Sequence, residues 1–542
     1  MSSVVTAPEP RNEPVLSYAP GTPERKELKD TLGSMSGERI EIPLVIAGRE
    51  VRTGDTGEVV APHDHGHLLA TWHKAGPEEA RLAIETSREA WREWSRWGAE
   101  ERAAIFLRAA DLLAGPWRAR LNAATMLGQS KTAHQAEIDA ACELIDFWRY
   151  NVHFAQRVYA EQPESGAGIW NRLDHRPLEG FVYAVTPFNF TSIAGNLPTA
   201  PALMGNVVLW KPSLGALYSG YLIMKLLQQA GLPPGVINFI PGDPAAITEA
   251  VLGDPELAGI HFTGSTSVFR SIWKQVGERL DGYRSYPRLV GETGGKNFIV
   301  AHPSADPAAL ATAIVRGGYE YQGQKCSAAS RVYVADSLWP GVKERAVGMM
   351  GELRTGDVAD FRNFMGAVIS RAAFDKIRRY LDHAGRSPAV KIVAGGGSDD
   401  SRGYFIEPTL LEVSDPQEKV LREEIFGPVV SVYVYPESDW EGVLRLVDET
   451  GPYALTGAVF ANERAAVQRA SQALRHAAGN FYVNDKPTGA VVGQQPFGGA
   501  RASGTNDKAG SVLNLLRWVS PRVIKETFVP PRDFEYPFME EK

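Results

Sequence analysis

The chain contains two cysteines, and only one of them lies among residues that could support chemistry. Cys326 stands in the polar segment Tyr321-Gln-Gly-Gln-Lys-Cys-Ser-Ala-Ala-Ser330, which is not typical of a core cysteine. A free thiol has a pKa of about 8.5, so only a few per cent is thiolate at neutral pH. Lys325 or local backbone N–H groups could raise that fraction. The segment predicts a nucleophile, with an inert, half-exposed thiol as the alternative.

A carboxylate with the setting of a general base follows an apolar strand in Arg288-Leu-Val-Gly-Glu-Thr-Gly-Gly-Lys-Asn297. The two glycines after Glu292 and Thr293 let the backbone approach a ligand closely. A carboxylate in a partly desolvated cleft has a raised pKa and can accept a proton near neutral pH. The alternative is a solvated acid beside a Gly-Gly turn.

A neutral hydrogen-bond donor comes directly after another strand, in Ala184-Val-Thr-Pro-Phe-Asn-Phe-Thr191. The side chain of Asn189 has two N–H donors, which suit an oxyanion without adding a charge that would trap the product. An ordinary Asn in the turn after Pro187 is the alternative.

Two further strand ends have features of a nucleotide site. Lys211 ends the buried stretch Val208-Leu-Trp-Lys-Pro-Ser213, so we expect its ammonium to reach ribose hydroxyls or a phosphate. In Ile260-His-Phe-Thr-Gly-Ser-Thr-Ser-Val268, Gly264 and the hydroxyl residues after it open a predicted helix whose N–H groups suit a pyrophosphate. Each of these signals is weak by itself, because ordinary turns also follow strands.

The elements that carry these residues alternate between short apolar strands and helical stretches such as Gly215–Ala230. This pattern predicts a doubly wound, mainly parallel sheet, with ligands beyond the carboxyl ends of its strands. A second alternating region, from about residue 298 to 499, predicts a second α/β lobe. The strands expected in the first region are Phe181–Val185, Val207–Trp210, Val236–Ile240, Ile260–Phe262 and Arg288–Val290.

The regions before the first sheet contain an arm, strands and helices. Residues 1–38 are rich in Pro, Glu and Ser and are expected to form an extended arm, followed by strands around Ile40–Ile46 and Arg52–Val60. Helical patterns run from Pro77 to Ala114 and from Thr132 to Tyr159. Cys142 falls on the apolar face of the latter and is interpreted as a small buried hydrophobe.

Bulk composition excludes several classes of function. The net charge is −7 and the pI about 6.0, with no dominant basic stripe, so nucleic acid is not an expected partner. No apolar run reaches the roughly 18 residues needed to span a bilayer. Residues 1–32 lack both a secretory apolar core and the Arg-rich make-up of a transit peptide, which led us to expect a cytoplasmic protein.

Taken together and in order, the motifs resemble the aldehyde dehydrogenase superfamily from about residue 40 to 530. They are Thr186-Pro-Phe-Asn189, Lys211-Pro-Ser, Phe262-Thr-Gly-Ser265, Glu292-Thr-Gly-Gly-Lys296, Gly323-Gln-Lys-Cys326 and Glu423-Glu-Ile-Phe-Gly-Pro428. Longer strings are similar to the 1-pyrroline-5-carboxylate (glutamate-γ-semialdehyde) dehydrogenases within it. These are Phe188-Asn-Phe-Thr191, Asn196-Leu-Pro-Thr-Ala-Pro-Ala-Leu-Met-Gly-Asn206, Tyr321-Gln-Gly-Gln-Lys-Cys-Ser327, Asn480-Phe-Tyr-Val-Asn-Asp-Lys486 and Gly493-Gln-Gln-Pro-Phe-Gly-Gly-Ala-Arg-Ala-Ser-Gly-Thr-Asn506.

The resemblance implies oxidation of glutamate γ-semialdehyde to glutamate with NAD, the second step of proline catabolism. Cys326 would form a thiohemiacetal and then a thioester, Asn189 would stabilise the oxyanion, and Glu292 would activate the hydrolytic water. The resemblance also implies a cofactor site at Thr186, Pro187, Phe188, Lys211, Gly264, Ser265, Thr266, Ser267, Val268, Glu424 and Phe426. For the substrate it implies Phe190, Ser327, Gly489, Ala490 and Phe497. No metal is expected.

The implied fold is α/β: a Rossmann-type NAD-binding domain, an α/β catalytic domain and a small oligomerisation flap. The NAD-binding domain would span residues 39–165 and 185–297, the catalytic domain 298–505, and the oligomerisation segments 166–184 and 506–542. We expect a homo-oligomer, dimer or higher. At this length we expect no fused proline dehydrogenase, although a separate one is a possible partner.

Two departures from the superfamily pattern bear on cofactor choice. Leu214 occupies the position, three residues after Lys211, where many members place a Glu that grips the adenosine ribose. The usual Gly-rich turn is Pro241-Gly-Asp-Pro244 here. NAD is still expected, because no extra basic residue stands beside Lys211. Three alternatives are another semialdehyde dehydrogenase of the superfamily, a CoA-acylating relative and a non-catalytic NAD-binding protein. Glu292 counts against the CoA-acylating relative, and a non-catalytic protein need not retain nucleophile, base and oxyanion donor together.

Overall fold

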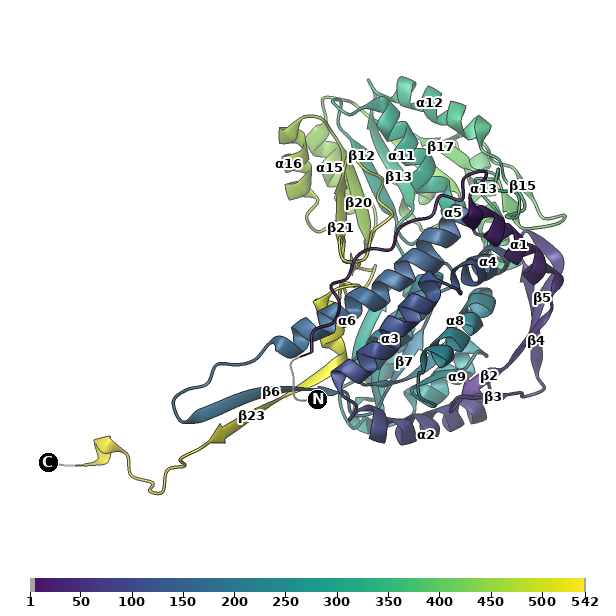
Figure 1. Cartoon of the computed structure of the whole chain (residues 1–542). Coiled ribbons are helices and arrows are strands. Elements are labelled where there is room, and N and C mark those ends of the chain that lie inside the picture. Colours follow the sequence, from purple (N-terminus) through teal and green to yellow (C-terminus); the bar gives the residue numbers. More distant parts are fainter. Residues whose placement is uncertain (1–4, 541–542) are drawn as a thin grey trace.

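The strands predicted between residues 181 and 292 form the centre of a seven-stranded sheet in the first of two lobes (Figure 1). In this computed structural model, which describes residues 5–540, the strand order is β11-β10-β7-β8-β9-β2-β3. Pairing is parallel from β11 to β9 and antiparallel at β2 and β3. The bounds are β2 Leu44–Ile46, β3 Arg49–Val51, β7 Phe181–Val185, β8 Val207–Lys211, β9 Ile237–Phe239, β10 Leu257–Thr263 and β11 Arg288–Glu292.

The order of these strands creates the crevice that the sequence predicts. The chain runs from β7 to β8 and β9 on one side and then returns to place β10 on the other side of β7. Loops that leave β7 and β10 therefore diverge, which opens a ligand crevice at the carboxyl ends of the strands. The covering helices are α2 Pro77–Trp94, α3 Ala99–Ala114, α4 Arg118–Gln129, α6 Leu144–Ala160, α7 Thr191–Leu203, α8 Leu217–Ala230, α9 Pro244–Leu252 and α10 Thr266–Glu278.

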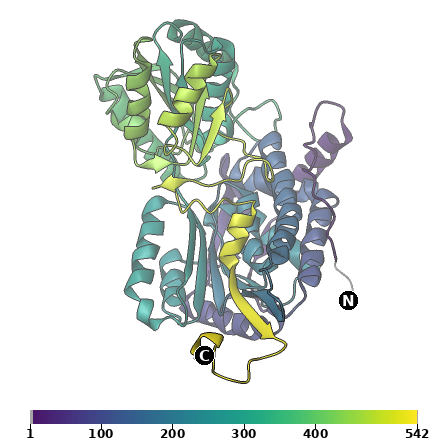
Figure 2. The same ribbon diagram turned by 90° about the vertical axis from the view of Figure 1, so that its left-hand side faces the viewer.

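The second lobe contains another seven-stranded sheet, in the order β14-β17-β18-β13-β12-β20-β21, and lies above the first in Figure 2. The chain enters it directly from β11, since only residues 293–296 separate β11 from β12. Its strands are β12 Asn297–Ala301, β13 Ala329–Ala335, β14 Val390–Ala394, β17 Thr409–Val413, β18 Val429–Tyr435, β20 Thr456–Phe460 and β21 Asn480–Val483. Its helices are α11 Pro307–Tyr319, α12 Trp339–Glu352, α13 Arg371–Arg386, α15 Trp440–Glu449 and α16 Arg464–Ala473.

The N-terminal region is less extended than the sequence suggested. Its second half forms α1, Pro23–Gly37, which buries Leu28, Leu32 and Met35. Four- and three-residue spacing puts these apolar side chains on one face, and Pro23 suits a first helical turn. Residues 5–22 do remain extended apart from a turn. The next strands, β1 Ile40–Ile42, β4 Thr56–Ala61 and β5 Asp64–His73, form a three-stranded sheet.

The two predicted helices before residue 160 are each interrupted. The first breaks at residues 95–98 into α2 and α3. The second comprises α5, Ala133–Ala136, a π-helical turn, Glu137–Glu143, and α6. Cys142 lies on that turn and is buried, as expected, but its neighbours are charged: the sulfur lies 3.6 Å from both Arg118 Nη2 and Glu137 Oε1. Its burial was therefore predicted correctly, and its contacts with charged groups were not foreseen.

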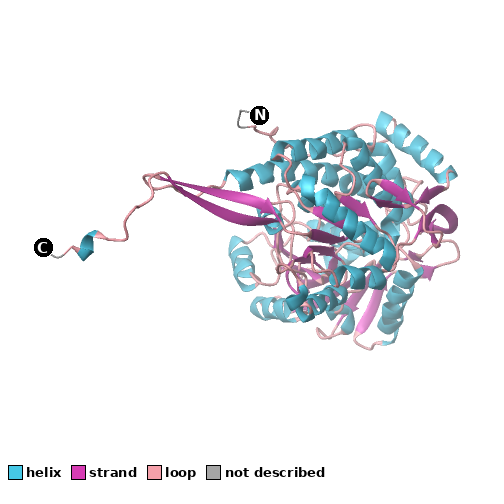
Figure 3. Ribbon diagram, turned by 90° about the horizontal axis from the view of Figure 1, so that it is seen from below, coloured by secondary structure: helices cyan, strands magenta, loops and turns pink. Residues whose placement is uncertain are grey.

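A two-stranded arm projects from the body (Figure 3). In it, β6 Ile169–Pro177 pairs antiparallel with β23 Val519–Thr527. The segments 166–184 and 506–542, which were expected to serve oligomerisation, also contain residues 181–184 of β7 and the buried Leu515 and Trp518. The short elements are β15 Ser398–Asp399, β16 Phe405–Ile406, β19 Tyr453–Ala454, β22 Ala500–Arg501, α14 Lys419–Arg422 and α17 Val512–Leu515. Among residues 5–540, no helix is long and apolar enough to cross a bilayer.

Candidate active site

A cavity of about 840 Å³ lies between the lobes, and most of the predicted cofactor residues line it. The first lobe contributes the loops after β7 and β10 and the end of β8. The second contributes the segment before β13 and the segment before β18. The predicted residues that line the cavity are Thr186, Pro187, Phe188, Asn189, Lys211, Gly264, Ser265, Val268, Cys326, Glu424 and Phe426.

The nucleophile candidate sits at the end of a turn built from left-handed backbone. Tyr321, Gln322 and Gly323 have φ values of 51°, 54° and 65°. A Cβ on Gly323 would lie 2.2 Å from the carbonyl oxygen of Gly427, so no other residue fits there without a shift. The Gln322 amide holds the turn in place by donating to Ser130 O (3.0 Å) and Ala367 O (2.7 Å). Residues in such conformations persist only where their surroundings fix them.

The Cys326 thiol is protonated in this geometry. Burial raises its pKa to about 12, and the carboxylates of Glu292, Glu424 and Glu143 act in the same direction. The expected help from Lys325 is absent, because its ammonium is paired with Glu320 at 3.0 Å. The counteracting influence is a backbone hydrogen bond from Ser327. The thiolate must therefore form with a base at hand.

Glu292 ends β11, where the chain leaves the first lobe. It does not line the cavity, but it is close enough for its charge to raise the pKa of Cys326. Burial raises the pKa of Glu292 well above its usual value. Gly499 N–H donates to Oε2 at 3.0 Å, and this bond and the nearby Lys508 ammonium oppose the rise. A raised pKa makes the ionised form of Glu292 a stronger base toward water or a thiol.

Asn189 is joined directly to the cysteine turn. Its Nδ2 donates one hydrogen to Gln324 O at 3.0 Å, and Gln324 Oε1 in turn accepts from Ile369 N at 2.9 Å. An amide nitrogen carries two hydrogens. Since Asn189 lines the cavity together with Cys326, its second N–H can meet a ligand oxygen there. The predicted oxyanion donor and nucleophile are thus adjacent.

A buried ion pair, which the sequence reasoning missed, fixes the start of α7 just after Asn189. Lys131 Nζ lies 2.7 Å from Asp139 Oδ2, and both side chains are almost fully buried. Asp139 accepts from the backbone N–H groups of Thr191 (3.0 Å) and Ser192 (2.9 Å), which caps the helix. Lys131 Nζ also lies 4.3 Å from the centre of the Phe190 ring. The sequence does carry a signal for this pair: a lysine stands just before the predicted helix from Thr132 to Tyr159, and acids interrupt the apolar face of that helix.

Glu143 lies next to this pair, and its surroundings favour the protonated carboxyl. Ser192 Oγ is 2.7 Å from both Asp139 Oδ1 and Glu143 Oε2. A hydroxyl has one hydrogen to give. If it goes to Asp139, which already balances Lys131, the contact with Glu143 needs a proton on that carboxyl. Burial and the charge of Asp139 raise the pKa of Glu143 to about 8, in agreement with this assignment.

The first-lobe end of the cavity has the features of a nucleotide site. Ser265 caps α10, so the N–H groups of that helix start at the cavity wall. Gly264 gives the backbone room, because a Cβ there would lie 2.7 Å from the Phe262 ring. Lys211 is buried at the end of β8, and burial lowers its pKa to about 8. Leu214, the departure from the superfamily pattern, is 43% exposed and offers no polar group.

At the second-lobe end of the cavity, the carboxylate of Glu424 is held in place by the backbone. Gly295 N–H donates to Glu424 Oε1 at 2.8 Å, and a Cβ on Gly294 would lie 2.5 Å from Oε2. Close approach to Glu424 thus accounts for Gly294, whereas a Cβ on Gly295 would lie 2.5 Å from the carbonyl oxygen of Cys326. The Phe188 and Phe426 rings meet edge to face at 5.9 Å beside it. These groups suit ribose hydroxyls and a flat heteroaromatic ring.

The structure does not bring every predicted residue to the cavity. The Thr266 hydroxyl contacts Ala502 O and Gly294 N, and the Ser267 hydroxyl meets that of Ser265 at 3.3 Å; neither side chain lines the wall. Both lie in the exposed first turn of α10, where side chains point away from the axis that their N–H groups follow.

The predicted substrate residues also lie outside this cavity. Ser327 follows Cys326 and contacts Thr488 Oγ1 at 2.8 Å, which connects the cysteine segment to the loop with Gly489 and Ala490. Gly489 has a φ of 96°. Phe497 pairs through its backbone with Ala509. That loop, residues 484–498 after β21, is called the anchor loop below.

Three further polar residues at the site were not singled out from the sequence. Asn297 Nδ2 donates to Cys326 O at 2.7 Å and to Ala328 O at 2.9 Å, which braces the cysteine segment from β12. Lys376 lines the cavity. Lys296 Nζ is buried, without a hydrogen-bond partner among residues 5–540, and burial lowers its pKa to about 7. Lys296 and Asn297 belong to the segment already identified around Glu292, but the sequence did not indicate what their side chains contact.

Comparison with known proteins agrees with this geometry. Residues 50–520 match the Aldehyde dehydrogenase family. The mitochondrial delta-1-pyrroline-5-carboxylate dehydrogenases of Danio rerio and Homo sapiens are 51% and 50% identical, over 98% of this chain and 96% and 94% of theirs. The crystal structure of the Mycobacterium tuberculosis delta-pyrroline-5-carboxylate dehydrogenase bound with NAD is 55% identical, covers 100% of both chains and superposes with a TM-score of 0.97.

The prediction of a cytoplasmic protein is contradicted by these relatives, because those from Danio rerio and Homo sapiens are named as mitochondrial. That prediction rested on the composition of residues 1–32. Residues 23–37 form α1, which packs three apolar side chains against the first lobe. The composition of that part of the segment is therefore explained by packing and does not indicate a cellular compartment. With the family profile, the full-length relatives and the shared fold in agreement, the chain belongs to the aldehyde dehydrogenase family.

Proposed function

We propose that this protein oxidises L-glutamate γ-semialdehyde, the open form of 1-pyrroline-5-carboxylate, to L-glutamate with reduction of NAD. One observation carries the proposal: the Asn189 amide is bonded to the Cys326 turn at the wall of a dinucleotide-sized cavity. The names of the full-length relatives supply the substrate. The overall reaction consumes aldehyde, NAD⁺ and water and yields carboxylic acid, NADH and a proton.

The proposed chemistry uses three side chains in sequence. The Cys326 thiol gives its proton to Glu292 and attacks the aldehyde carbon, forming a C–S bond and an oxyanion. The second Asn189 N–H and the Cys326 backbone N–H stabilise that oxygen. After hydride departure, the carbon is held as a thioester. Glu292 next releases the thiol proton to solvent and, ionised again, deprotonates a water that attacks the thioester carbon. The C–S bond breaks, the acid leaves, and the Cys326 thiolate takes the proton from Glu292, which restores both groups.

NAD supplies the hydride acceptor when bound, and the cavity fits it. Lys211 and the first turn of α10 suit the ribose and pyrophosphate of the adenosine half, and Glu424 suits the ribose of the nicotinamide half. Phe188 and Phe426 are placed to pack by the nicotinamide ring.

The substrate proposal concerns the other side of Cys326. We assign Ser327 and the backbone N–H groups of Gly489 and Ala490 to the α-carboxylate, because an acidic protein must hold an anion with local dipoles. Phe190 and Phe497 are assigned to the aliphatic stem. The direct contact between Ser327 and Thr488 supports this grouping, since it sets the anchor loop against the catalytic cysteine.

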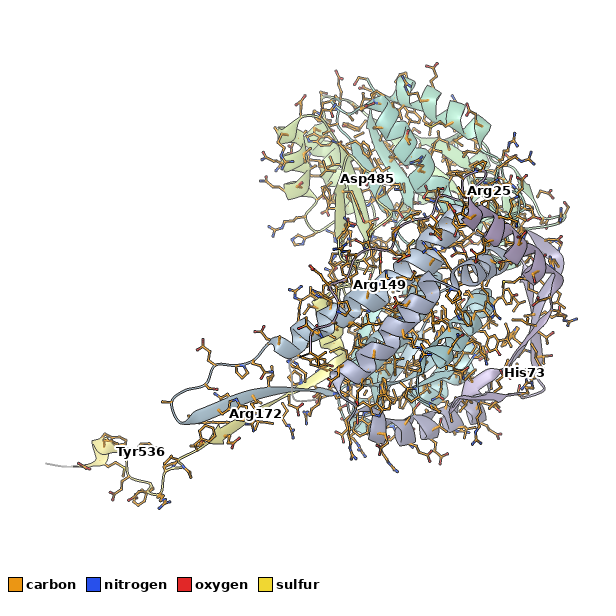
Figure 4. All side chains as sticks on the ribbon, in the orientation of Figure 1. Arg25, His73, Arg149, Arg172, Asp485 and Tyr536 are labelled. Atoms are coloured by element: carbon orange, nitrogen blue, oxygen red, sulfur yellow. The ribbon has the colours of Figure 1, made fainter. Side chains whose placement is uncertain are left out.

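We further propose that the β6–β23 arm joins two or more subunits. Its outer end and the segment after it expose large apolar side chains, and Tyr536 in Figure 4 lies beyond the arm, away from the body. Exposed apolar side chains concentrated in one projection are typical of interaction sites. They are Val523, Phe528, Val529, Phe534, Tyr536 and Phe538. We also propose a separate proline-oxidising enzyme as a source of the substrate.

The test is an assay of purified protein with NAD and 1-pyrroline-5-carboxylate, following NADH and glutamate. Cys326→Ala should abolish both. Glu292→Gln keeps the shape of the side chain but cannot act as a base, so we expect at most one equivalent of NADH per active site and little turnover. Normal turnover by that variant would refute the assignment of the base. If the wild type prefers butanal to pyrroline-5-carboxylate, the substrate is wrong although the chemistry is right.

A further inference from the structure

The first described residues of the chain run between the two lobes and along α6, as the purple trace in Figure 1 shows. We call residues 5–22 the N-terminal strap. Ala7 N–H donates to Gln156 Oε1 at 3.0 Å, and Leu16 N–H donates to Glu137 Oε1 at 2.9 Å. These contacts, one toward each end, fasten the strap to the helical layer of the first lobe.

The middle of the strap is held by charge. Glu13 accepts from Arg118 Nη1 at 2.6 Å and from Arg149 Nη1 at 2.7 Å, and its carboxylate is only 11% exposed. Arg149, labelled in Figure 4, projects from α6. Glu13 N–H donates to Asp146 Oδ1 at 2.7 Å. A largely buried carboxylate shared by two guanidiniums forms strong charge-assisted hydrogen bonds, so the backbone at residue 12 has little freedom.

Asn12, the neighbour of Glu13, uses all the hydrogen bonds that its amide offers. Nδ2 donates to Asp146 Oδ2 and to Val492 O, both at 2.8 Å. Oδ1 accepts from Gln494 Nε2 at 2.9 Å and from Tyr150 OH at 3.3 Å. An amide has two donor hydrogens and two acceptor lone pairs. The side chain thus connects α6 of the first lobe with the anchor loop of the second.

The anchor loop depends on such outside contacts. Gly489 and Gly493 have φ values of 96° and 83°, and a Cβ on Gly493 would lie 2.2 Å from the Tyr150 ring. Glycines in this region give a loop little conformational preference of its own. The direction in which the Gly489 and Ala490 N–H groups point is therefore set by what the loop touches, and Val492 and Gln494 follow within a few residues.

We propose that Asn12 is a positioning residue for substrate recognition: it latches the anchor loop to α6, and so aims the backbone donors that bind the substrate carboxylate. The proposal rests on the function proposed above for Gly489 and Ala490. It assigns a role in specificity to a strap that belongs to neither sheet. Asn12 itself does not touch the substrate, and its effect on the reaction passes through the loop.

The test compares Asn12→Ala with Arg11→Ala, a change at an exposed neighbour in the same strap. For Asn12→Ala we expect KM for pyrroline-5-carboxylate to rise about tenfold, since two donated and two accepted hydrogen bonds to the loop and helix are lost. We expect KM for NAD and the kcat/KM for butanal, which lacks a carboxylate, to stay within about twofold of wild type. Arg11→Ala should match wild type throughout.

A merely structural role would affect all three constants alike, and that result would overturn the proposal. Hydrogen exchange of residues 487–495 gives a second readout that does not depend on the substrate. We expect faster exchange in Asn12→Ala and in Gln494→Ala, but not in Arg11→Ala; unchanged exchange in Asn12→Ala would also overturn the proposal. If wild type does not oxidise pyrroline-5-carboxylate, the proposed function fails, and the exchange experiment still decides whether Asn12 orders the loop.

Discussion

Replacing Asn189 by alanine separates catalysis from stability better than any other change at the site. The amide has two tasks in this structure: one N–H bonds to Gln324 O at 3.0 Å, and the other is assigned to the oxyanion. Loss of the first costs about 1 kcal/mol of stability, the net value of a typical hydrogen bond. Loss of the second costs about 2.7–4 kcal/mol in the transition state, a 10²- to 10³-fold fall in kcat.

The assay is NADH formation at saturating NAD, with thermal unfolding measured on the same samples. We expect kcat and kcat/KM to fall together, because the oxyanion exists only after attack. KM for NAD should stay unchanged. The matched control is Asn151→Ala, which removes an equally buried amide that donates to Asn196 Oδ1 at 2.9 Å in the first lobe, away from the cavity wall.

The Asn151 variant should lose stability without a comparable loss of kcat. The reasoning is refuted if Asn189→Ala retains more than about a fifth of wild-type kcat, since one oxyanion donor is worth far more than that. It is also refuted if the two variants lose kcat in proportion to their loss of stability. Either result would mean that the amide only supports the fold of the cysteine turn.

Three further expectations concern the thiol, the buried ion pair and the cysteine turn. The pKa of Cys326 is raised to about 12, so the thiolate fraction of the unliganded enzyme should rise about tenfold per pH unit up to that value. The rate of alkylation of Cys326 by iodoacetamide measures this fraction. A rate that is already constant from neutral pH upward would contradict the raised pKa. Asp139→Asn leaves Lys131 buried without its counter-charge and should cost about 3–5 kcal/mol in urea unfolding, and a cost below about 1 kcal/mol would show that the pair is dispensable. Gly323→Ala forces a Cβ to within 2.2 Å of Gly427 O and should reduce both stability and kcat. The control Gly351→Ala, in α12, places a Cβ where nothing lies within 4 Å and should be nearly neutral. Equal behaviour of the two variants would exclude strain at the turn.

The sequence was informative where a pattern is local. The strand β7 has the predicted bounds and β8 extends one residue beyond them, because a buried parallel strand shows as a short apolar run between turn residues. The same is true of the site motifs: Cys326, Asn189 and the cofactor residues each follow or precede such a strand. Parallel strands aligned in one sheet bring their ends to one edge, so the meeting of these residues could be expected from order alone.

Tertiary structure decided the charge states and the roles of distant partners. Lys325 stands next to Cys326 in sequence, yet it is bound to Glu320, and burial rather than a neighbouring ammonium sets the pKa of the thiol. The pairing of Lys131 with Asp139, the protonation of Glu143 and the bridge from Asn12 to Val492 depend on contacts across many residues. Desolvation and hydrogen bonding are properties of a three-dimensional environment, and no spacing along a chain encodes them directly.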